Sequence, residues 1–564
     1  MKKEIAKILK KALKELDIKL KEQEVEKFVE IPPSSEMGDF AFPCFSFANQ
    51  LKMSPHEIAL AVREKIGNPP LNKFEDIQVS GSYVNFFLDR KDLARQLIWK
   101  TLNQKENFGK SKIGKQKKIV VEFSAPNIAK PFGIGHLRST IIGNSIANIS
   151  EFVGFKTVRL NYLGDWGSQF GKLILGYEKF GNEKKLQENP IKHLLELYVK
   201  ISKDKKYDKK SREWFKKLEE KNHKAVTLWR AFRELSIEEF TKLYKILEIS
   251  FDVLDAESLH QKGMATILKQ LEKKKLLKKS QGALVVDLNE FGLGVALIQK
   301  SDGTTLYLTR DLAAAISRYK KYGFSKMIYE VGQEQILHFR QLFKILELLG
   351  YAWAKDCIHV GHGLYLDKDG KKFSTRKGKT IFMKDIIDKT VSLAKKEIKK
   401  RTPDISQKQL EDRALKVAIS AIFYGDLKNY RANDLVFDIN RFIAFEGDTG
   451  PYIQYSYARA SSILRKAKNK NRVNEIPELE PAELELVKKL YEFPEVVLKA
   501  FEDLNSALIA NYSYQISQAF NEFYHSCPVM GSTQEPFRLA LIESFRQILR
   551  NALKLLGIKT LEEM

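Results

Sequence analysis

The stretch KIVVEFSAPNIAKPFGIGHLRSTIIGNSIANI, residues 118–149, decides the fold expected for this chain. Its first six residues form a short, largely β-branched apolar run, which predicts a buried strand. Gly133 and Gly135 then free the backbone to turn tightly, and a helical pattern follows, so that the positive end of a helix dipole points at the turn. The basic residues in and beside the turn are Lys130, His136 and Arg138. This combination suits a bound phosphate, although an ordinary strand–helix turn explains the local pattern equally well.

Similar apolar runs recur along the chain, with helical patterns between them. They are TVRLNYLG, GALVVDL, KMIYEVG and CIHVGHG. Strands that alternate with helices predict βαβ units and a parallel sheet of the Rossmann type. We place this sheet in residues 113–390, interrupted by a lysine-rich helical insertion at about 180–280.

Two further domains are expected on either side of the sheet. Residues 1–112 begin with a helical pattern and end in VSGSYVNFFL, an alternating aromatic strand, which predicts a small α+β domain. Beyond about residue 390 only helical periodicity remains, so residues 391–564 are predicted to form an all-α domain. The fold class is therefore multidomain α/β.

The composition limits the classes of protein to consider. Among 564 residues, 96 lysines and arginines stand against 71 aspartates and glutamates, a net charge of +25. This excess favours a polyanionic partner, because neutralised phosphates release counterions, although a general lysine bias gives the same number. We find no apolar run of about 18 residues and no signal peptide, so no membrane segment is expected. The three cysteines lie far apart without a Cys-x-x-Cys pair, which favours a reducing cytoplasm over a disulfide framework or a cysteine zinc site.

A second basic loop, DKDGKKFSTRKGKT, follows the last apolar run at residues 367–380. Its mobile lysines and its hydroxyl groups could follow charge as a triphosphate reacts. Taken alone, the loop is equally compatible with a solvated basic hairpin. Two such loops on opposite halves of one parallel sheet indicate phosphate binding far more specifically than either loop alone.

Together these motifs resemble those of class I aminoacyl-tRNA synthetases, and within them the arginyl-tRNA synthetases. GIGH at 133–136 stands where the family has His-x-Gly-His, and KFSTR at 372–376 stands where it has Lys-Met-Ser-Lys-Ser. The arginyl subgroup is indicated by SAPNIAKP, LNYLGDWGSQFG, LYLTRDLAAA and FEGDTGPYIQYSYAR, in the expected order along essentially the whole chain. The resemblance implies an ATP-dependent enzyme, with Mg²⁺ accompanying the nucleotide and no protein-bound zinc, that joins L-arginine to tRNA(Arg) through an arginyl-adenylate.

The resemblance also assigns the residues that act on ATP. Thr375 replaces the inner lysine of the second motif, and Lys130 stands where many arginyl enzymes are thought to compensate for that replacement. The implied catalytic residues are Lys130, His136, Lys372, Ser374 and Arg376. The implied ATP-binding residues are Gly133, Gly135, His136, His362, Gly363, Lys372 and Phe373, and His338 falls near the same region.

The amino-acid pocket is predicted to centre on Asp311, because a carboxylate is the natural partner of a planar, always charged guanidinium. We expect Asp311 to follow a strand and open a helix, where it could instead cap that helix beside Thr309. By resemblance, Tyr307 and Asp311 hold the guanidinium, and Glu257 is a further candidate on that side. The α-amino end of arginine is assigned to Glu122, Asn127 and Gln335, whereas Asp165 and Trp166 are expected to shape the pocket wall.

The two flanking domains are expected to contact tRNA. By resemblance, residues 391–564 read the anticodon, and residues 1–112 touch the outer corner of the tRNA. Aromatic residues could stack unpaired bases, although most aromatics of a helical domain pack in its core. The candidate tRNA contacts are Tyr452, Tyr455, Tyr524 and the C-terminal Met564. We expect a monomer, as is the habit of the family.

Two other interpretations stay open. A class I synthetase for another amino acid would require zinc-ligand cysteines or a large editing insertion, and neither is apparent in the sequence. A catalytically inactive tRNA-binding paralogue is suggested by Gly133, which stands where the family has histidine. The amino-acid pocket and the second phosphate loop argue against it, since a binding module needs neither.

Overall fold

The computed structural model describes residues 2–33, 37–67, 74–301, 307–367, 369–371, 382–467, 473 and 475–564. The chain forms two compact units. The first comprises Met1–Glu106, Ile463–Glu492 and Gln518–Ile548, and the second comprises Asn107–Ser462, Phe493–Ser517 and Leu549–Met564.

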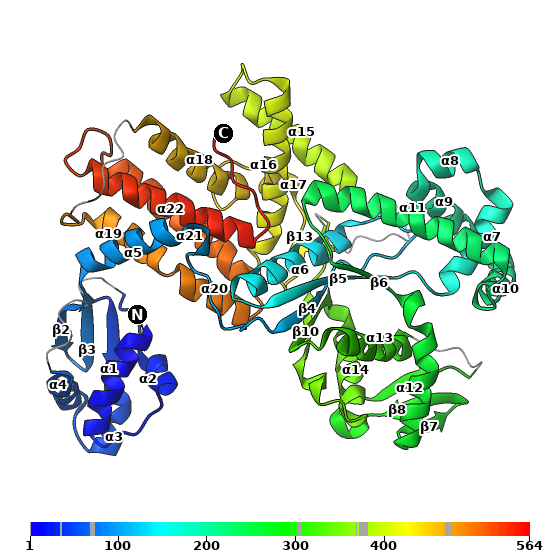
Figure 1. Ribbon diagram of the computed structural model, residues 1–564, viewed down its shortest axis with the longest axis horizontal. Helices are drawn as coiled ribbons and strands as arrows, with labels where there is room; N and C mark the ends of the chain where they lie inside the picture. Colours follow the sequence, from blue (N-terminus) through cyan, green and yellow to red (C-terminus); the bar gives the residue numbers. More distant parts are fainter. Residues whose placement is uncertain are drawn as a thin grey trace. The chain divides into compact units, whose positions relative to one another are not determined.

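The N-terminal part of the first unit combines helices with an antiparallel sheet, which confirms the predicted α+β character (Figure 1). Its strands lie in the order β1 (Phe40–Pro43), β3 (Tyr83–Leu88) and β2 (Phe74–Ser80). Its helices are α1 (Lys2–Glu15), α2 (Glu22–Phe28), α3 (Ala48–Leu51), α4 (Pro55–Ile66) and α5 (Arg90–Gln104). On α1 the buried residues Ile5, Leu9 and Leu13 recur about one turn apart, so a single apolar face binds this charged helix to the unit.

A five-stranded parallel sheet dominates the second unit. Its strands lie in the order β11 (Cys357–His362), β10 (Lys326–Gly332), β4 (Lys118–Glu122), β5 (Lys156–Leu163) and β6 (Val253–Ala256). The chain thus starts in the middle at β4, builds outward to β6, and returns to the other side of β4 with β10. This is the Rossmann order, and the predicted fold class is confirmed. Ligands of such sheets bind where the strand order reverses, at the carboxyl ends of β4 and β10.

One of the predicted sheet strands was wrong. The run GALVVDL forms β8 (Ala283–Asp287), which pairs with β7 (Leu277–Ser280) and β9 (Val295–Gln299) in a separate antiparallel sheet. The edge strand β6, which sequence patterning did not single out, takes the place in the parallel sheet. Short apolar runs indicate a strand but do not specify its partner, because pairing depends on tertiary context.

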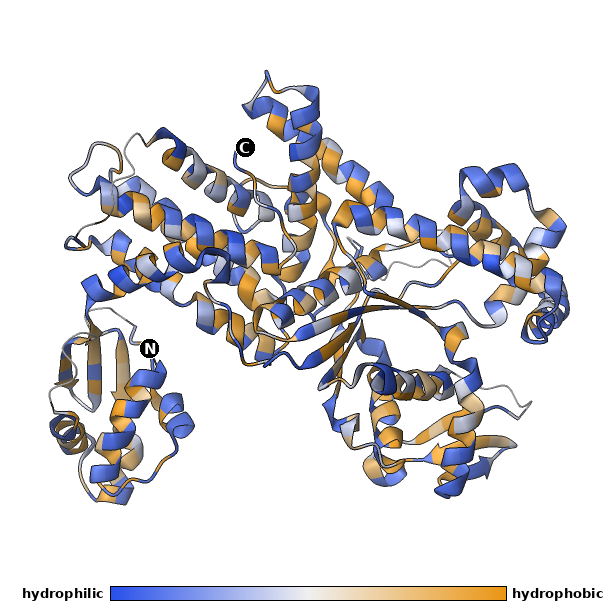
Figure 2. Ribbon diagram, viewed as in Figure 1, coloured by the Kyte–Doolittle hydropathy of each residue, from blue (hydrophilic) through white to orange (hydrophobic). Residues whose placement is uncertain are grey.

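Helices cover both faces of the parallel sheet (Figure 1). α6 (Ile134–Phe152) lies on one face, and α13 (Tyr307–Tyr322) with α14 (Ile336–Leu348) lies on the other. Between β5 and β6 the chain forms α7 (Ser168–Phe180), α8 (Glu183–Glu188), α9 (Pro190–Ser202), α10 (Asp208–Glu219) and α11 (His223–Leu247), and α12 (Gln261–Lys273) follows β6. Apolar residues concentrate along the sheet strands, whereas α11 alternates polar and apolar faces (Figure 2). Val120 of β4 and Leu160 of β5 are buried in one core with residues of α12, α13 and α14.

The C-terminal part of the chain is helical, as predicted. It contains α15 (Met383–Arg401), α16 (Gln407–Leu427), α17 (Ile439–Phe442), α18 (Gly450–Lys466), α19 (Pro481–Tyr491), α20 (Phe493–Glu502), α21 (Ala507–Ser526) and α22 (Glu535–Leu555). A two-residue strand, β13 (Leu435–Val436), pairs with β12 (Tyr365–Leu366). Across the described ranges, no helix combines the length and apolarity that crossing a bilayer requires.

Candidate active site

A cavity of about 420 Å³ opens at the carboxyl ends of the parallel strands, where the strand order reverses. The six residues predicted to hold arginine all line this cavity: Glu122, Asn127, Glu257, Tyr307, Asp311 and Gln335. They come from the ends of β4 and β10, from the 3-10 helix that follows β6, and from α13. Segments far apart in the sequence therefore supply one site, and the roles of the six residues within it stay predictions.

Asp311 lies inside a helix rather than at its start. α13 begins at Tyr307, so Asp311 is one turn further along and on the same face as Tyr307. This excludes the helix-capping alternative, because capping requires a residue at the helix terminus. Asp311 Oδ1 accepts a hydrogen bond from the Tyr162 hydroxyl at 3.3 Å, and Oδ2 accepts one from His338 Nε2 at 2.8 Å. His338, expected near the nucleotide, thus lines the amino-acid cavity and orients Asp311.

Glu257 forms a second acidic group of the cavity. Its Oε2 accepts a hydrogen bond from Arg310 Nη1 at 3.2 Å, yet burial outweighs this pairing and raises the pKa of Glu257 to about 8. The next residue, Ser258, donates from its amide and hydroxyl to Asp165, at 2.8 and 2.7 Å. Asp165 is itself fully buried and ion-paired with Arg233 at 2.9 Å, so it fixes the segment that carries Glu257. Asp165 does not itself line the cavity, and it acts on the wall through Ser258, so its wall role stays a prediction.

Trp166, also expected in the pocket wall, is buried against other aromatic rings. Its indole packs edge-on to Trp229, with ring centroids 5.6 Å apart, and does not line the cavity. Trp229 in turn donates from Nε1 to the backbone carbonyl of Asp165 at 2.8 Å. Trp166 therefore supports the wall from behind.

Glu122 is the acidic group that β4 contributes to the cavity, at the end of that strand. It is buried and pairs with Arg318 of α13. Burial raises the pKa of Glu122 to about 7, against the pull of Arg318 and helped by the charges of Asp311 and Asp255. Arg318 was not predicted, although it follows Asp311 by seven residues, the helical spacing that puts both side chains on one face.

Two amides and a tyrosine also line the cavity. The Asn127 side chain lies so close to Gly164 that a Cβ there would come 2.5 Å from Asn127 Oδ1, so any larger residue would displace this amide. Gln335 closes the 3-10 helix Gln333–Gln335 that follows β10. Tyr329, missed within the apolar run of β10, has a buried hydroxyl with no hydrogen-bond partner among the residues that the structure describes, and it lines the cavity.

The glycine turn lies at the start of α6. Gly133 is the N-cap residue, and its amide donates to His136 Nδ1 at 3.3 Å. Burial, together with the charges of Lys130 and His362, lowers the pKa of His136 to about 4, so the ring is neutral. With Nδ1 accepting, the proton of the neutral ring sits on Nε2, which is then a donor. At Gly135 an added Cβ would meet no described atom within 4 Å, so a ligand could approach the turn closely.

Lys130, the lysine predicted to compensate for Thr375, lies two residues before Phe132 on the same turn. Its ammonium is 5.9 Å from the centre of the Tyr198 ring and is partly exposed. Its positive charge acts on His136, which shows that the two groups share one region. The other implied catalytic residues are Lys372, Ser374 and Arg376. All three, and the implied ATP-binding residue Phe373, lie outside the described residues.

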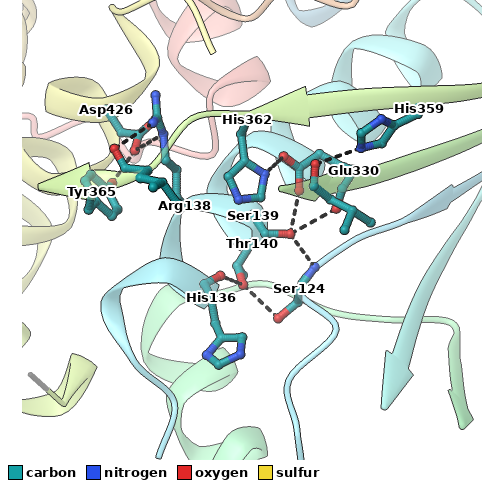
Figure 3. A network of polar contacts seen from close by, with 12 residues as sticks. Ser124, His136, Arg138, Ser139, Thr140, Glu330, His359, His362, Tyr365 and Asp426 are labelled. Atoms are coloured by element: carbon teal, nitrogen blue, oxygen red, sulfur yellow. Dashed lines mark hydrogen bonds and ion pairs between the residues drawn. The ribbon is translucent and has the colours of Figure 1, made fainter. Parts of the chain in front are cut away.

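A buried polar network supports the turn from behind (Figure 3). Glu330 at the end of β10 is fully buried and accepts hydrogen bonds from Ser139 Oγ and from His362 Nδ1, the latter at 2.7 Å. Burial would lower the pKa of His362, but the Glu330 charge more than offsets this and raises it. Ser139 Oγ also accepts from the amide of Ser124 at 3.0 Å, which connects α6 to the end of β4. In the sequence, Glu330 could be noticed only as the one acidic residue of the otherwise apolar run KMIYEVG.

Arg138 does not serve the phosphate turn, so this expectation was wrong. Its side chain is only 1% exposed, ion-pairs with Asp426 at 3.4 Å, and donates to the carbonyl oxygen of Asn433 at 2.8 Å (Figure 3). Successive helical residues turn by about 100°, so Arg138 faces roughly away from His136. The adjoining Gly363 fits only as glycine, because a Cβ there would come 2.5 Å from that same Asn433 oxygen.

The predicted tRNA contacts lie on several C-terminal elements. On α18, the Tyr452 ring packs against Tyr514 with centroids 5.6 Å apart, and the Arg459 guanidinium lies 4.8 Å over the Tyr455 ring. Tyr524 of α21 is 39% exposed, and Met564 is partly exposed. These side chains stay candidates for base stacking. In the described part of the chain, no three His, Cys, Asp or Glu side chains are grouped to hold a metal ion.

Family models match three consecutive parts of the chain. Residues 3–88 match the arginyl tRNA synthetase N terminal domain, residues 97–439 match the class I (R) tRNA synthetase catalytic domain, and residues 453–564 match the DALR anticodon binding domain. Curated proteins named arginine–tRNA ligase are similar over nearly the full length. The one from Clostridium perfringens is 42% identical over 570 residues, covering 99% of each chain, and the one from Halothermothrix orenii is 42% identical over 551 residues, covering 96% of each.

Solved structures show the same fold. The chain matches the arginyl-tRNA synthetase of Thermus thermophilus with a TM-score of 0.84 and 24% identity, over 100% of both chains. It matches that of Plasmodium falciparum with a TM-score of 0.84 and 26% identity, over 100% of this chain and 99% of the other.

Proposed function

This chain belongs to the class I arginyl-tRNA synthetase family, and on that premise we propose that it joins L-arginine to tRNA(Arg) in an ATP-dependent reaction. In the first step the arginine carboxylate attacks the α-phosphate of ATP, which releases pyrophosphate and leaves arginyl-adenylate. In the second step the 2′-hydroxyl of the terminal adenosine of tRNA attacks the adenylate, and AMP leaves.

The cavity at the switch point of the sheet is the observation that carries this proposal. Its lining includes the carboxylates of Glu122, Glu257, Glu334 and Asp311, which suits a small ligand with two cationic groups. Asp311 and Tyr307 would take the guanidinium, with Glu257 beside them. Glu122, Asn127 and Gln335 would take the α-ammonium group. A protein that only bound tRNA would need no such cavity.

ATP is assigned to the glycine turn and the adjoining end of β11. The neutral His136 would donate from Nε2 to a phosphate oxygen, and Lys130 would add positive charge where negative charge develops in the transition state. His362 and Gly363 would border the nucleotide, and Lys372, Phe373, Ser374 and Arg376 would act from the second basic loop. Mg²⁺ would arrive with the nucleotide, because the turn offers nitrogen donors rather than the oxygen ligands that Mg²⁺ prefers.

For tRNA we propose a division of labour among three domains, with bounds 1–112, 113–390 and 391–564. The first would contact the outer corner of the tRNA, and the last would read the anticodon with Tyr452, Tyr455, Tyr524 and Met564. The net charge of +25 supports a phosphate-rich partner.

We propose that the protein works as a monomer in the cytoplasm. The three buried, unpaired thiols of Cys44, Cys357 and Cys527 are compatible with the reducing conditions there.

Charging of tRNA(Arg) transcripts with labelled arginine tests the proposal directly. We expect charging that requires ATP and that labelled lysine does not support. Binding of arginine, ATP and tRNA without any charging would instead favour the inactive paralogue. Pyrophosphate exchange with and without tRNA would then show whether arginine activation waits for tRNA, as the family resemblance implies.

A further inference from the structure

The cavity contains an arginine of its own. Arg318 extends from α13 into the cavity wall with only 4% of its side chain exposed. Its guanidinium pairs with Glu122 at the end of β4 and, through Nε at 3.0 Å, with Asp255 on β6. These two strands are not neighbours, because β5 lies between them. The Tyr162 ring of β5 lies under the guanidinium, 4.5 Å from Cζ, so one side chain crosses the ends of three strands.

A guanidinium suits this bridging position better than an ammonium group would. Its planar fork can serve two acceptors at fixed angles and can stack on an aromatic ring, whereas a lysine provides one compact point charge. The chain of contacts continues past Asp255, whose Oδ1 accepts a hydrogen bond from His260 Nε2 at 2.8 Å. His260 closes the 3-10 helix that begins with Glu257, so the same contacts extend to the segment that carries Glu257.

We propose that Arg318 is a positioning residue that prepares Glu122 to receive the α-ammonium group of the substrate, an inference that rests on the proposed function. Arg318 occupies Oε2 of Glu122, whereas Oε1 accepts no hydrogen bond within the described part of the chain. Glu122 can therefore present one oxygen of fixed direction. A single oxygen suits a point charge such as an ammonium group, and it suits the two-pronged donor face of a guanidinium poorly.

Arg318 also preserves the charge of Glu122. That carboxylate is buried and lies in the fields of Asp311 and Asp255, conditions that favour uptake of a proton. Without the adjacent guanidinium, Glu122 would be neutral and its side chain unanchored. It would then lose its selective affinity for an ammonium group, while the guanidinium site at Asp311 would stay in place.

Two ligands separate this role from a merely structural one. L-Arginine carries the α-ammonium group, and 5-guanidinovalerate is the same molecule without it. We expect the wild-type protein to bind arginine at least about 30-fold more tightly than 5-guanidinovalerate, because a charged, hydrogen-bonded pair is lost with the amino group. In Arg318→Gln the preference should fall to about threefold or less, mainly through weaker arginine binding. Arg318→Lys should give an intermediate preference, since the charge remains but cannot bridge both carboxylates.

Arg159→Gln is the matched control. Arg159 also bridges several side chains, with Glu151 at 2.9 Å and Asn144 at 2.9 Å, but it does not line the cavity. This variant should keep the wild-type preference. Dissociation constants for both ligands are measured by calorimetry on one preparation of each variant, so their ratio does not depend on the folded fraction.

An Arg318→Gln protein that loses affinity for both ligands by the same factor would overturn the inference, because Arg318 would then only hold the fold. If Arg318→Gln does not fold, Asp255→Asn replaces it, because this substitution removes the other carboxylate that anchors Arg318. It should also reduce the preference for arginine over 5-guanidinovalerate, and an unchanged preference would refute the positioning role of Arg318. A wild-type protein that binds neither ligand would instead refute the proposed function.

Discussion

Replacing Asp311 by asparagine should remove the main charge that attracts the substrate guanidinium. The substitution keeps the size of the side chain, and the amide oxygen can still accept from Tyr162 or His338, the present partners of Asp311 at 3.3 and 2.8 Å. What is lost is the negative charge and one of the two oxygens that a guanidinium fork contacts. The expected defect is therefore one of arginine recognition and not of folding.

The magnitude follows from the surroundings of Asp311. Removing one partner of a buried charge pair costs about 2–5 kcal/mol, and solvent screening reduces this for exposed groups. The Asp311 side chain is 22% exposed, so the lower half of that range applies. A loss of about 2–3 kcal/mol corresponds to roughly 30- to 150-fold weaker arginine binding.

Calorimetry with L-arginine and L-citrulline provides the assay, because citrulline replaces the guanidinium by a neutral group of similar shape. Asp311→Asn should weaken arginine binding strongly, change citrulline binding little and leave ATP binding intact. The preference for arginine over 5-guanidinovalerate should survive, since it depends on Glu122 and Arg318 and not on Asp311. Near-normal arginine affinity in Asp311→Asn, or equal losses for arginine and citrulline, would show that the guanidinium binds elsewhere.

Three further outcomes are expected. Arginine binding, measured by calorimetry, should weaken as the pH falls from about 8.5 to 6. Burial raises the pKa of Glu257 to about 8 and that of Glu122 to about 7, so both take up protons in the free enzyme and lose the charge that a cation requires. An affinity that does not change over this range would contradict the prediction. His136→Ala should slow adenylate formation at least about tenfold, because it removes a hydrogen-bond donor to the reacting phosphate. Gly133→His should change this rate little. If the wild-type protein does not charge tRNA and Gly133→His does, the inactive-paralogue interpretation is established. Binding of tRNA should weaken steeply between low and high salt, as measured by filter binding, and salt-independent affinity would exclude an interface dominated by phosphate contacts.

The sequence predicted best what depends on local order along the chain. KIVVEF followed by glycines and a helical pattern predicted β4, the turn and α6, because strand period, glycine freedom and helix period are all local properties. Asp311 and Tyr307 were paired by resemblance to the arginyl enzymes, and the structure places them one turn apart on the same face of α13. The same spacing puts Arg318 on this face too, two turns further along α13.

Features that depend on tertiary contacts could not be read in this way. GALVVDL has the composition of a sheet strand, but nothing in its sequence tells which sheet it joins. Arg138 shares the turn with His136 in sequence, yet its orientation on α6 carries it to Asp426, almost 300 residues away. Glu330 and Tyr329 lie in an apolar run and are both buried, so their polar groups gain meaning only from neighbours on other strands and helices.

A cavity for arginine must prevent the substrate from binding backwards, since the ligand carries a cation at each end. Glu122 and Glu257 each share their charge with an arginine of the protein, Arg318 and Arg310. Among the described residues Asp311 pairs with no arginine; a hydroxyl contacts one of its oxygens and an imidazole the other, so each oxygen keeps a lone pair for the guanidinium fork. The fork-shaped end of the substrate therefore has one favourable place, at Asp311, and Arg318 leaves a single oxygen of Glu122 for the compact α-ammonium group. Lysine, which has a point charge at both ends, could not use the paired oxygens of Asp311 and should bind far more weakly than arginine.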